Sequence, residues 1–122
     1  MNEIDATMLC VYVNAGERRE GKPLYQVIVE SARRTNLAGA SVFPIDLSFG
    51  SQRIVHDLSS DYSAADVPVA VEIVDRPEKI REFVSTFHPL LGTALVTEKA
   101  VHVLHGWHAG DTALPGADGE TA

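Results

Sequence analysis

VPVAVEIVDRPEKIREF, residues 67–83, contains a strand and the beginning of a helix in direct succession. Apolar side chains recur at every second position from Val67 to Val74, which is the period of a β-strand. Asp75 then stands three residues before Glu78, and the proline between them favours the first turn of a helix. The apolar side chains of that helix fall on one face: Ile80, Phe83, Val84 and Phe87. The stretch therefore predicts a β-α unit.

A similar strand and helix precede this unit in the chain. Thr7–Val13 is an apolar run of β-favouring residues, and residues 14–16 form its exit turn. Pro23 suits the first turn of a helix that ends near Asn36. Small and apolar side chains recur along this helix at helical spacing: Leu24, Val27, Ile28, Ser31 and Ala32. The first part of the chain therefore also predicts a β-α unit.

Each of the two helices is followed by a further strand. Ala38–Phe49 predicts one of them, and Pro44 indicates an edge position or a bulge near the end of its pairing. His88-Pro89 and Gly92 predict the end of the second helix, and Ala94–Leu104 predicts the last strand, bent or broken around Glu98-Lys99. The order β-α-β-β-α-β predicts an α+β fold of the ferredoxin-like type, a four-stranded antiparallel sheet with two helices on one face.

Two segments of the chain lack a secondary-structure period. Gly50–Asp66 is polar, and connections of this length inside a compact domain are usually functional or mobile. Residues 107–122 are rich in glycine, alanine and acidic residues, which predicts a flexible tail. We therefore expect one domain, residues 1–106, with a long loop at residues 50–66.

The first strand is apolar on both of its faces. One face carries Leu9, Val11 and Val13, and the other carries Met8, Cys10 and Tyr12. Two helices can cover only one side of the sheet, so the other side needs a second cover. Packing against further copies of the same chain is the expected cover, which predicts a homo-oligomer.

The composition of the chain restricts its partners and location. The formal net charge of −7 argues against nucleic acid and anionic membranes, because both bind clustered lysine and arginine. Cys10 is the single cysteine, so no internal disulfide framework is expected. Residues 1–6 lack the positive charge of a signal peptide, and no apolar run reaches the ~20 residues of a membrane helix. We therefore expect a cytoplasmic protein.

Several stretches of the sequence resemble those of one protein family. They are VYVNAGERREGKPLYQVIVESA (residues 11–32), LAGASV and SFG within residues 37–50, His56, and VPVAVEIVDRPEKIREF (residues 67–83). Over residues 7–105 the chain is similar to domain of unknown function 190, also called the UPF0166 family, which resembles the PII signalling proteins. The resemblance implies ferredoxin-like, PII-like subunits that are usually trimeric and have a regulatory, signalling role.

The strings GKPLY (residues 21–25) and VEIVD (residues 71–75) are the most specific parts of the resemblance. The chain also departs from the family pattern at three places. They are Pro44-Ile45 in place of Arg-Gly, Ser48-Phe49-Gly50 in place of Gly-Phe-Gly, and Ser63-Ala64 in place of Leu-Ser. All three departures lie at the end of the second strand or in the long loop, where PII-like proteins hold ligands and contact partners.

The resemblance implies a site for an adenine nucleotide at a cleft between subunits. Glycine lets a backbone approach phosphate closely, and lysine or arginine neutralises the phosphate charge. The residues available for this role are Gly50, Gln52, Arg53, Gly92, Thr93 and Lys99. The competing interpretation is that these residues are turn glycines and solvated surface side chains. The long loop would also contact a partner protein, for instance a membrane transporter.

Two further groups of residues have side chains that could bind a ligand. His102, His105 and His108 suggest a metal site, but positions three apart on a strand face opposite sides. The alternative is two strand-edge histidines and one histidine in the tail. Glu17 and Lys22 flank the first loop, where a carboxylate either accepts backbone N–H groups near a helix start or contacts a ligand.

The sequence offers little support for catalysis. Cys10 lies inside an apolar strand, where a thiol acts as a small hydrophobe. His56 and Asp57 are adjacent, and adjacent residues rarely act as a base and its support. No nucleophile-elbow, phosphate-loop or zinc-protease motif occurs. We therefore expect no enzyme and no metal site. The alternatives are a small dimeric enzyme of the α+β-barrel type and a structural accessory subunit of a transporter.

Overall fold

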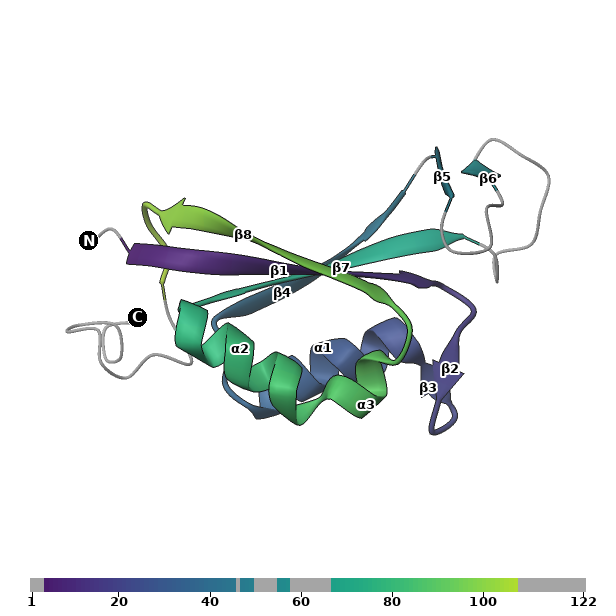
Figure 1. The fold of residues 1–122 in the computed structure, drawn as a ribbon, viewed down its shortest axis with the longest axis horizontal. Coiled ribbons are helices and arrows are strands. Elements are labelled where there is room, and N and C mark those ends of the chain that lie inside the picture. Colours follow the sequence, from purple (N-terminus) through teal and green to yellow (C-terminus); the bar gives the residue numbers. More distant parts are fainter. Residues whose placement is uncertain (1–3, 46, 50–54, 58–66, 108–122) are drawn as a thin grey trace.

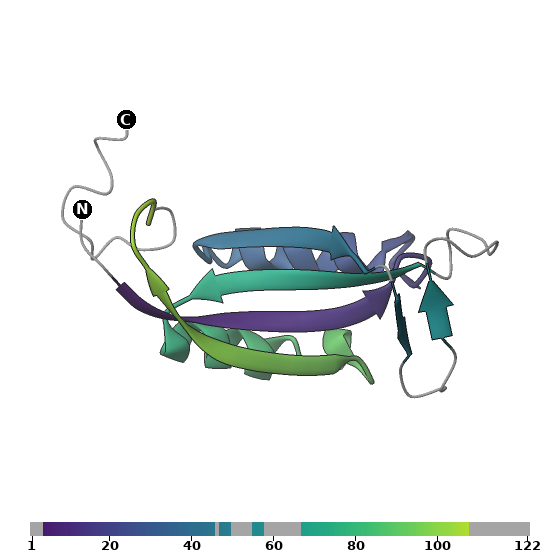
Figure 2. The same cartoon turned by 90° about the horizontal axis from the view of Figure 1, so that it is seen from above.

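A four-stranded antiparallel sheet forms the centre of the protein. The computed structural model describes residues 4–45, 47–49, 55–57 and 67–107. The strands of the sheet are β1 (Ile4–Asn14), β4 (Gly39–Pro44), β7 (Pro68–Asp75) and β8 (Leu95–Val103). They lie in the order β4-β7-β1-β8, and every neighbouring pair is antiparallel (Figure 2).

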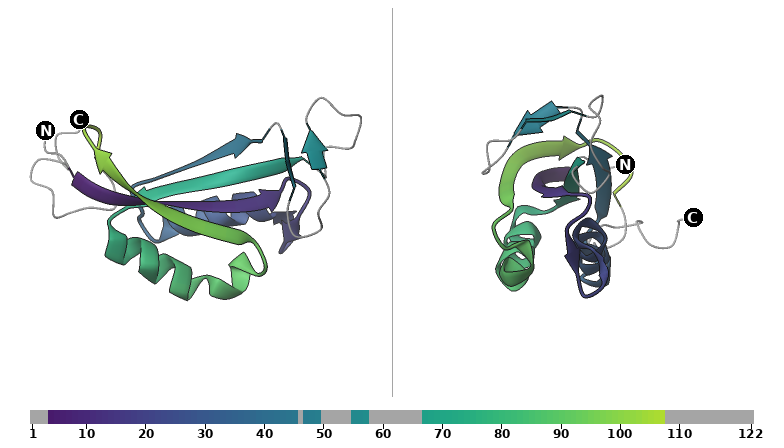
Figure 3. Two further views of the ribbon diagram at one scale, coloured as in Figure 1. Left: turned by 45° about the horizontal axis from the view of Figure 1, so that its top comes forward. Right: turned by 90° about the vertical axis from the view of Figure 1, so that its right-hand side faces the viewer.

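The helices cover one face of this sheet (Figures 1 and 3). They are α1 (Leu24–Arg34), α2 (Pro77–Thr86) and the short α3 (His88–Leu91). The core forms between the helices and alternate residues of the inner strands: Leu9, Val11, Val13, Leu24, Ile28, Ala32, Leu37, Val69, Val71, Ile73, Ile80, Phe83 and Leu91. This architecture confirms the ferredoxin-like prediction.

Proline and positive-φ residues define the helix ends. Pro23 precedes α1 with φ −56° and ψ 136°, so the helix begins at Leu24. Asn36 follows α1 at φ 62°, a left-handed conformation that asparagine tolerates well. Pro77 is the first residue of α2, as predicted. α2 ends at Thr86, just before His88-Pro89, as predicted. A short further helix, α3, begins at His88, because a proline in a first turn needs no N–H partner, and it ends at Gly92.

The predicted strand Ala38–Phe49 is divided in two. β4 ends at Pro44, where the Ile45 N–H donates to the Pro68 carbonyl at 3.0 Å as a last link to β7. β5 (Leu47–Phe49) then leaves the main sheet and pairs with β6 (Val55–Asp57). Residues 55–57 of the predicted irregular loop are therefore a strand. Pro44 closes an edge strand, as the sequence indicated, because it has no N–H for further pairing.

Two other local features differ from the prediction. β8 is continuous, since Glu98 and Lys99 pair with Leu9 and Met8 of β1 without a break. A small hairpin that the sequence did not predict, β2 (Arg18–Arg19) with β3 (Lys22–Pro23), lies between β1 and α1.

The turn of this hairpin uses two residues with positive φ, Glu20 at 58° and Gly21 at 80°. Two consecutive positive φ values are typical of the tight turns that match the twist of paired strands.

The described part of the chain extends one residue beyond the predicted domain. Trp107, which the sequence assigned to the tail, is buried. The guanidinium of Arg76, the residue before α2, lies 6.0 Å from the centre of its indole ring. This contact fixes the chain after β8 against the β7–α2 junction. The remainder of the predicted tail, residues 108–122, lies outside the described residues.

Candidate functional site

The face of the main sheet opposite the helices, here called the open face, has no cover within the described chain (Figure 3). The strand register places four side chains in one row across it: Phe43, Ala70, Tyr12 and Leu95. Phe43 is 47% exposed, Tyr12 38% and Leu95 64%. Large apolar side chains that line up on an exposed face mark an interaction surface.

The next row of the open face is polar. It consists of Ser41, Glu72, Cys10 and Thr97. A hydrogen bond between the Tyr12 and Cys10 side chains raises the pKa of the Tyr12 hydroxyl, and the Glu72 carboxylate raises it further. A reactive thiolate needs positive neighbours, whereas the register partners of Cys10 are a carboxylate and a hydroxyl. The geometry therefore gives Cys10 no support as a nucleophile.

A second feature is the end of the sheet where β1 and β4 finish and β7 and β8 begin. Asn14 pairs with Pro68, Pro44 with Val69, and Tyr12 with Leu95, so these four strand ends meet there. The β5–β6 hairpin and the β2–β3 hairpin extend from the same end (Figure 1). We call it the loop end.

Two of the predicted nucleotide-binding residues lie at the loop end. Gly92 ends α3 with φ 58° and ψ −124°, and Thr93 follows it in the turn into β8. Lys99 lies four residues beyond Leu95 on the open face, about 13 Å further along the strand, so the fold does not bring it to this turn. Gly50, Gln52 and Arg53 lie outside the described residues.

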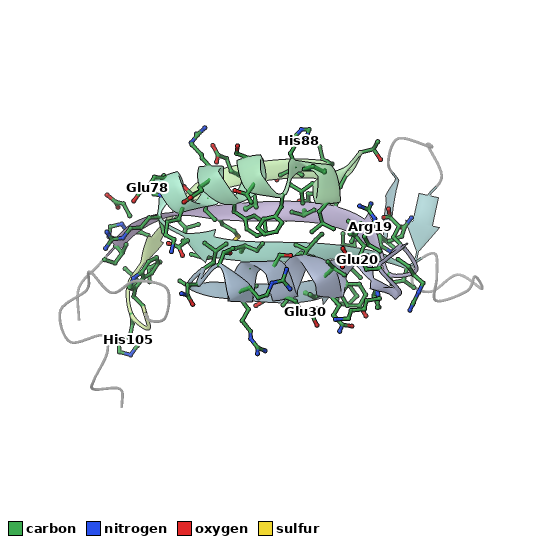
Figure 4. The ribbon with its side chains drawn as sticks, turned by 90° about the horizontal axis from the view of Figure 1, so that it is seen from below. Arg19, Glu20, Glu30, Glu78, His88 and His105 are labelled. Atoms are coloured by element: carbon green, nitrogen blue, oxygen red, sulfur yellow. The ribbon has the colours of Figure 1, made fainter. Side chains whose placement is uncertain are left out.

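The β2–β3 hairpin brings basic side chains to the loop end that the sequence analysis missed. Figure 4 shows Arg19 and Glu20 at this end of the molecule, opposite the end that carries His105. Arg18 donates from Nη2 to the Gly21 carbonyl, which holds it within the hairpin turn. Arg19 is exposed and makes no hydrogen bond or ion pair with any other residue that the structure describes. The sequence pattern that could have predicted this hairpin is Glu20-Gly21 between two short polar runs, which is only a weak turn pattern.

Glu17 and Lys22 have structural roles in the same region. Glu17 Oε1 accepts the Asn14 N–H at 3.0 Å, and the Glu17 carbonyl accepts the Leu24 N–H at 2.6 Å. Glu17 therefore holds the exit of β1 and the start of α1 together. Lys22 Nζ lies 3.1 Å from Glu30 Oε1. Hydrogen bonds from Gln26 and Lys22 lower the pKa of the exposed Glu30 carboxyl.

The histidines do not form a metal site within the described part of the chain. His102 Nδ1 lies 2.7 Å from Asp5 Oδ1, its register partner on β1. His105 follows β8 and is exposed at the end of the molecule opposite Arg19 (Figure 4). His108 lies outside the described residues, and no group of three metal-ligating side chains occurs among the others. His56 and Asp57 are residues of β6, paired with Ser48 and Leu47.

Two hollows among the described residues lie away from the loop end. One, of about 330 Å³, runs between α1 and the start of β4, and another, of about 180 Å³, lies between the end of α1 and α2. Neither is lined by a predicted nucleotide-binding residue. No helix of the described residues is long and apolar enough to cross a membrane.

Comparison with solved structures defines the class of fold. CPII, a nitrogen regulatory PII-like protein from Thiomonas intermedia K12 solved with ADP, AMP and bicarbonate, superposes with a TM-score of 0.63. The match covers 84% of this chain and 91% of CPII at 10% sequence identity. The apo form of CPII gives a TM-score of 0.56. The chain therefore has a PII-like ferredoxin fold.

Sequence comparison defines the family. The profile of DUF190, described as Uncharacterized ACR, matches residues 6–103. A UPF0166 protein of Aquifex aeolicus is 31% identical over 83 residues, which are 68% of this chain and 79% of the relative. A UPF0166 protein of Methanocaldococcus jannaschii is 26% identical over 84% of this chain and 95% of the relative. The chain belongs to the DUF190 family.

The structure explains the two strings that carried this resemblance. In residues 21–25, Gly21 supplies a positive φ, Pro23 precedes α1 and Leu24 is buried in the core. In residues 71–75, Val71 and Ile73 are core residues. Both strings therefore serve the fold to a large extent. Glu72 and Val74 differ, because they lie on the open face.

Proposed function

We propose that this protein is a PII-like regulatory module that binds a small anionic ligand, such as an adenine nucleotide, and is not an enzyme. The observation that carries the proposal is the fold, which matches nucleotide-bound CPII over most of both chains. The positive-φ turn at Gly92–Thr93 supports it, because that turn and the exposed Arg19, which has no ion-pair partner among the described residues, both lie at the loop end.

The chemistry of the loop end suits a phosphate group. A turn at a glycine allows backbone N–H groups to approach an anion closely, and the Thr93 hydroxyl can donate a hydrogen bond. Arg19 is available as a cation at this end, and the proposal adds Gly50, Gln52 and Arg53 from the adjoining loop. Lys99 is not part of the proposed site, because its strand position lies away from the turn.

We further propose that the site is completed in a homo-oligomer, with a trimer as the expected state. The exposed row Phe43, Tyr12 and Leu95 supports assembly through the open face. Mass measurement by analytical ultracentrifugation tests it. A dimer would instead favour the α+β-barrel enzyme, and a monomer at high micromolar concentration would contradict the assembly proposal altogether.

Isothermal titration calorimetry tests the ligand. ATP, ADP, AMP, cyclic AMP and cyclic dinucleotides are titrated separately into the full-length protein, and at least one is expected to bind. Thr93→Val should weaken that binding by about tenfold, the effect of one lost hydrogen bond to a charged group. Thr86→Val, at the end of α2 on the helix side, is the matched control. Absence of heat with every compound would overturn the nucleotide proposal.

The loop at residues 50–66 is the proposed contact for a partner protein, with a membrane transporter as one candidate. Affinity capture with the full-length protein, compared with a variant whose residues 50–66 are replaced by a short glycine-serine linker, tests this part. A partner retained equally by both proteins would contradict a contact through the loop.

A further inference from the structure

The charges on the open face are unusual for this acidic chain. Eleven apolar side chains of the described strands face this side: Ile4, Ala6, Met8, Tyr12, Phe43, Pro68, Ala70, Val74, Leu95, Val101 and Val103. The ionisable side chains there, apart from Cys10 and Tyr12, are Glu72 on β7 and Lys99 on β8. The chain as a whole has a formal net charge of −7, so a face with one anion and one cation differs from the rest of the surface.

Glu72 lies in the interior of this face. It is half-buried on an inner strand, and its register neighbours are Ser41 and Cys10. Lys99 is exposed on the edge strand β8, where it lies opposite Met8. The strand β1 separates them, which places their strands about 9.6 Å apart. Neither side chain forms an ion pair with another residue that the structure describes.

Covering this face would remove both charges from water. A carboxylate that is desolvated without a partner costs several kcal/mol, so a purely apolar cover is excluded as a stable one. The cover must bring a cation to Glu72 and an anion to Lys99 while it also buries Phe43, Tyr12 and Leu95. A second copy of the open face supplies both charges and the same apolar row.

We propose that the open face is covered by further copies of this chain, with Glu72 of one copy paired to Lys99 of the next. The inference rests on the proposed oligomer and deepens it by naming the pair that fixes the register between subunits. Because each copy carries one donor and one acceptor, the pairing satisfies every charge in a closed ring such as the proposed trimer.

Charge reversal with rescue tests the pairing. Glu72→Lys and Lys99→Glu are made singly and together, and the dissociation constant of the assembly is measured by analytical ultracentrifugation. Each single variant is expected to weaken assembly by at least about a hundredfold, because it places like charges together. The double variant should recover most of the wild-type affinity. Wild-type affinity in both single variants, or no recovery in the double variant, would overturn the pairing.

Two controls keep the test decisive. Glu82→Lys reverses a charge on the helix side, where it places a lysine four residues after Glu78, a favourable helical spacing, and it should assemble like the wild type. If a reversal variant does not fold by circular dichroism, Glu72→Gln, Lys99→Met and their combination replace it. The change in the dissociation constant of the double variant should then differ by about fivefold or more from the product of the two single changes. A double variant whose change equals that product would overturn the pairing.

The outcomes separate this inference from the proposed function. A wild-type monomer would remove the oligomer and the pairing together. An oligomer in which the charge variants behave independently would remove only the pairing. If Lys99 instead binds a nucleotide, Lys99→Glu should weaken nucleotide binding. Adding Glu72→Lys to that variant should then not restore the binding.

Discussion

The carboxylate of Asp75 accepts a hydrogen bond from the backbone N–H of Ala38, with 2.8 Å between Asp75 Oδ2 and the Ala38 nitrogen. Its other oxygen, Oδ1, accepts the Arg76 N–H at 2.6 Å. Asp75 is completely buried at the end of β7. One side chain therefore holds the approach to β4 against the junction between β7 and α2.

Asp75→Ala is expected to lower the free energy of unfolding by about 3 kcal/mol, because it leaves two part-buried N–H groups without this acceptor. Urea denaturation followed by circular dichroism measures the change. Asp5→Ala is the matched control, since Asp5 is 91% exposed and its pairing with His102 should contribute less than about 1 kcal/mol. Equal losses in the two variants would contradict a structural role for the buried carboxylate.

Gly21 and Gly39 form a natural pair for testing the β2–β3 turn. An added Cβ would meet no atom within 4 Å at either glycine, but Gly21 has a φ of +80°. Gly21→Ala should therefore cost about 1 kcal/mol through backbone strain alone. Gly39→Ala in β4 should be neutral or slightly stabilising. Thermal unfolding of both variants measures the difference. A larger loss of stability in Gly39→Ala than in Gly21→Ala would contradict the proposed strain at the Gly21 turn.

Tyr12 should make stability decrease at alkaline pH. The pKa of its hydroxyl is raised from the ordinary value of 10.0 by the hydrogen bond with Cys10. The stabilisation is complete below the unfolded-state pKa and is lost as the pH rises from about 10 through the folded-state pKa. Urea midpoints between pH 8 and 11, with absorbance at 295 nm to follow ionisation, measure it. Tyr12→Phe should flatten this decrease, whereas Tyr25→Phe should retain it.

The ion pair between Arg81 and Glu98 should contribute little to stability. Arg81 Nη2 lies 2.8 Å from Glu98 Oε2, but the two side chains are 72% and 42% exposed. Exposed pairs typically contribute about 0–1 kcal/mol, and salt screens them. Glu98→Gln should therefore change the urea midpoint by less than the Asp75→Ala variant does, and the small difference should vanish at 1 M salt. A loss as large as that of Asp75→Ala would contradict this.

The main elements of the fold could be predicted because their side chains follow a clear period. Val67–Val74 alternates as a strand, and Ile80 and Phe83 lie on the buried face of α2, as their spacing indicated. The division of the strand after Pro44 was not predicted, since β-favouring residues continue to Phe49 and a sequence does not show which partner they pair with. Trp107 was missed because its cover, Arg76, is distant in the sequence.

The candidate site was less predictable than the fold. Gly92 and Thr93 lie at the loop end, whereas Lys99 lies further along β8, and nucleotide binding by any of them stays a prediction. Arg19 could not be chosen, because two short strands of two residues have no detectable period. Glu72 looked like one member of a strand pattern, and only the register showed that it shares the open face with Lys99.

The position of β1 also determines when the domain can fold during synthesis. β1 begins at Ile4, yet one of its two neighbours is β8, whose last residue, Val103, pairs with Ile4. One edge of the first strand therefore keeps unpaired backbone groups until nearly the whole domain has left the ribosome. Pairing between such distant parts of a chain is slow, and exposed strand edges favour aggregation. Complete pairing of β1 in the nascent protein therefore waits for the synthesis of β8.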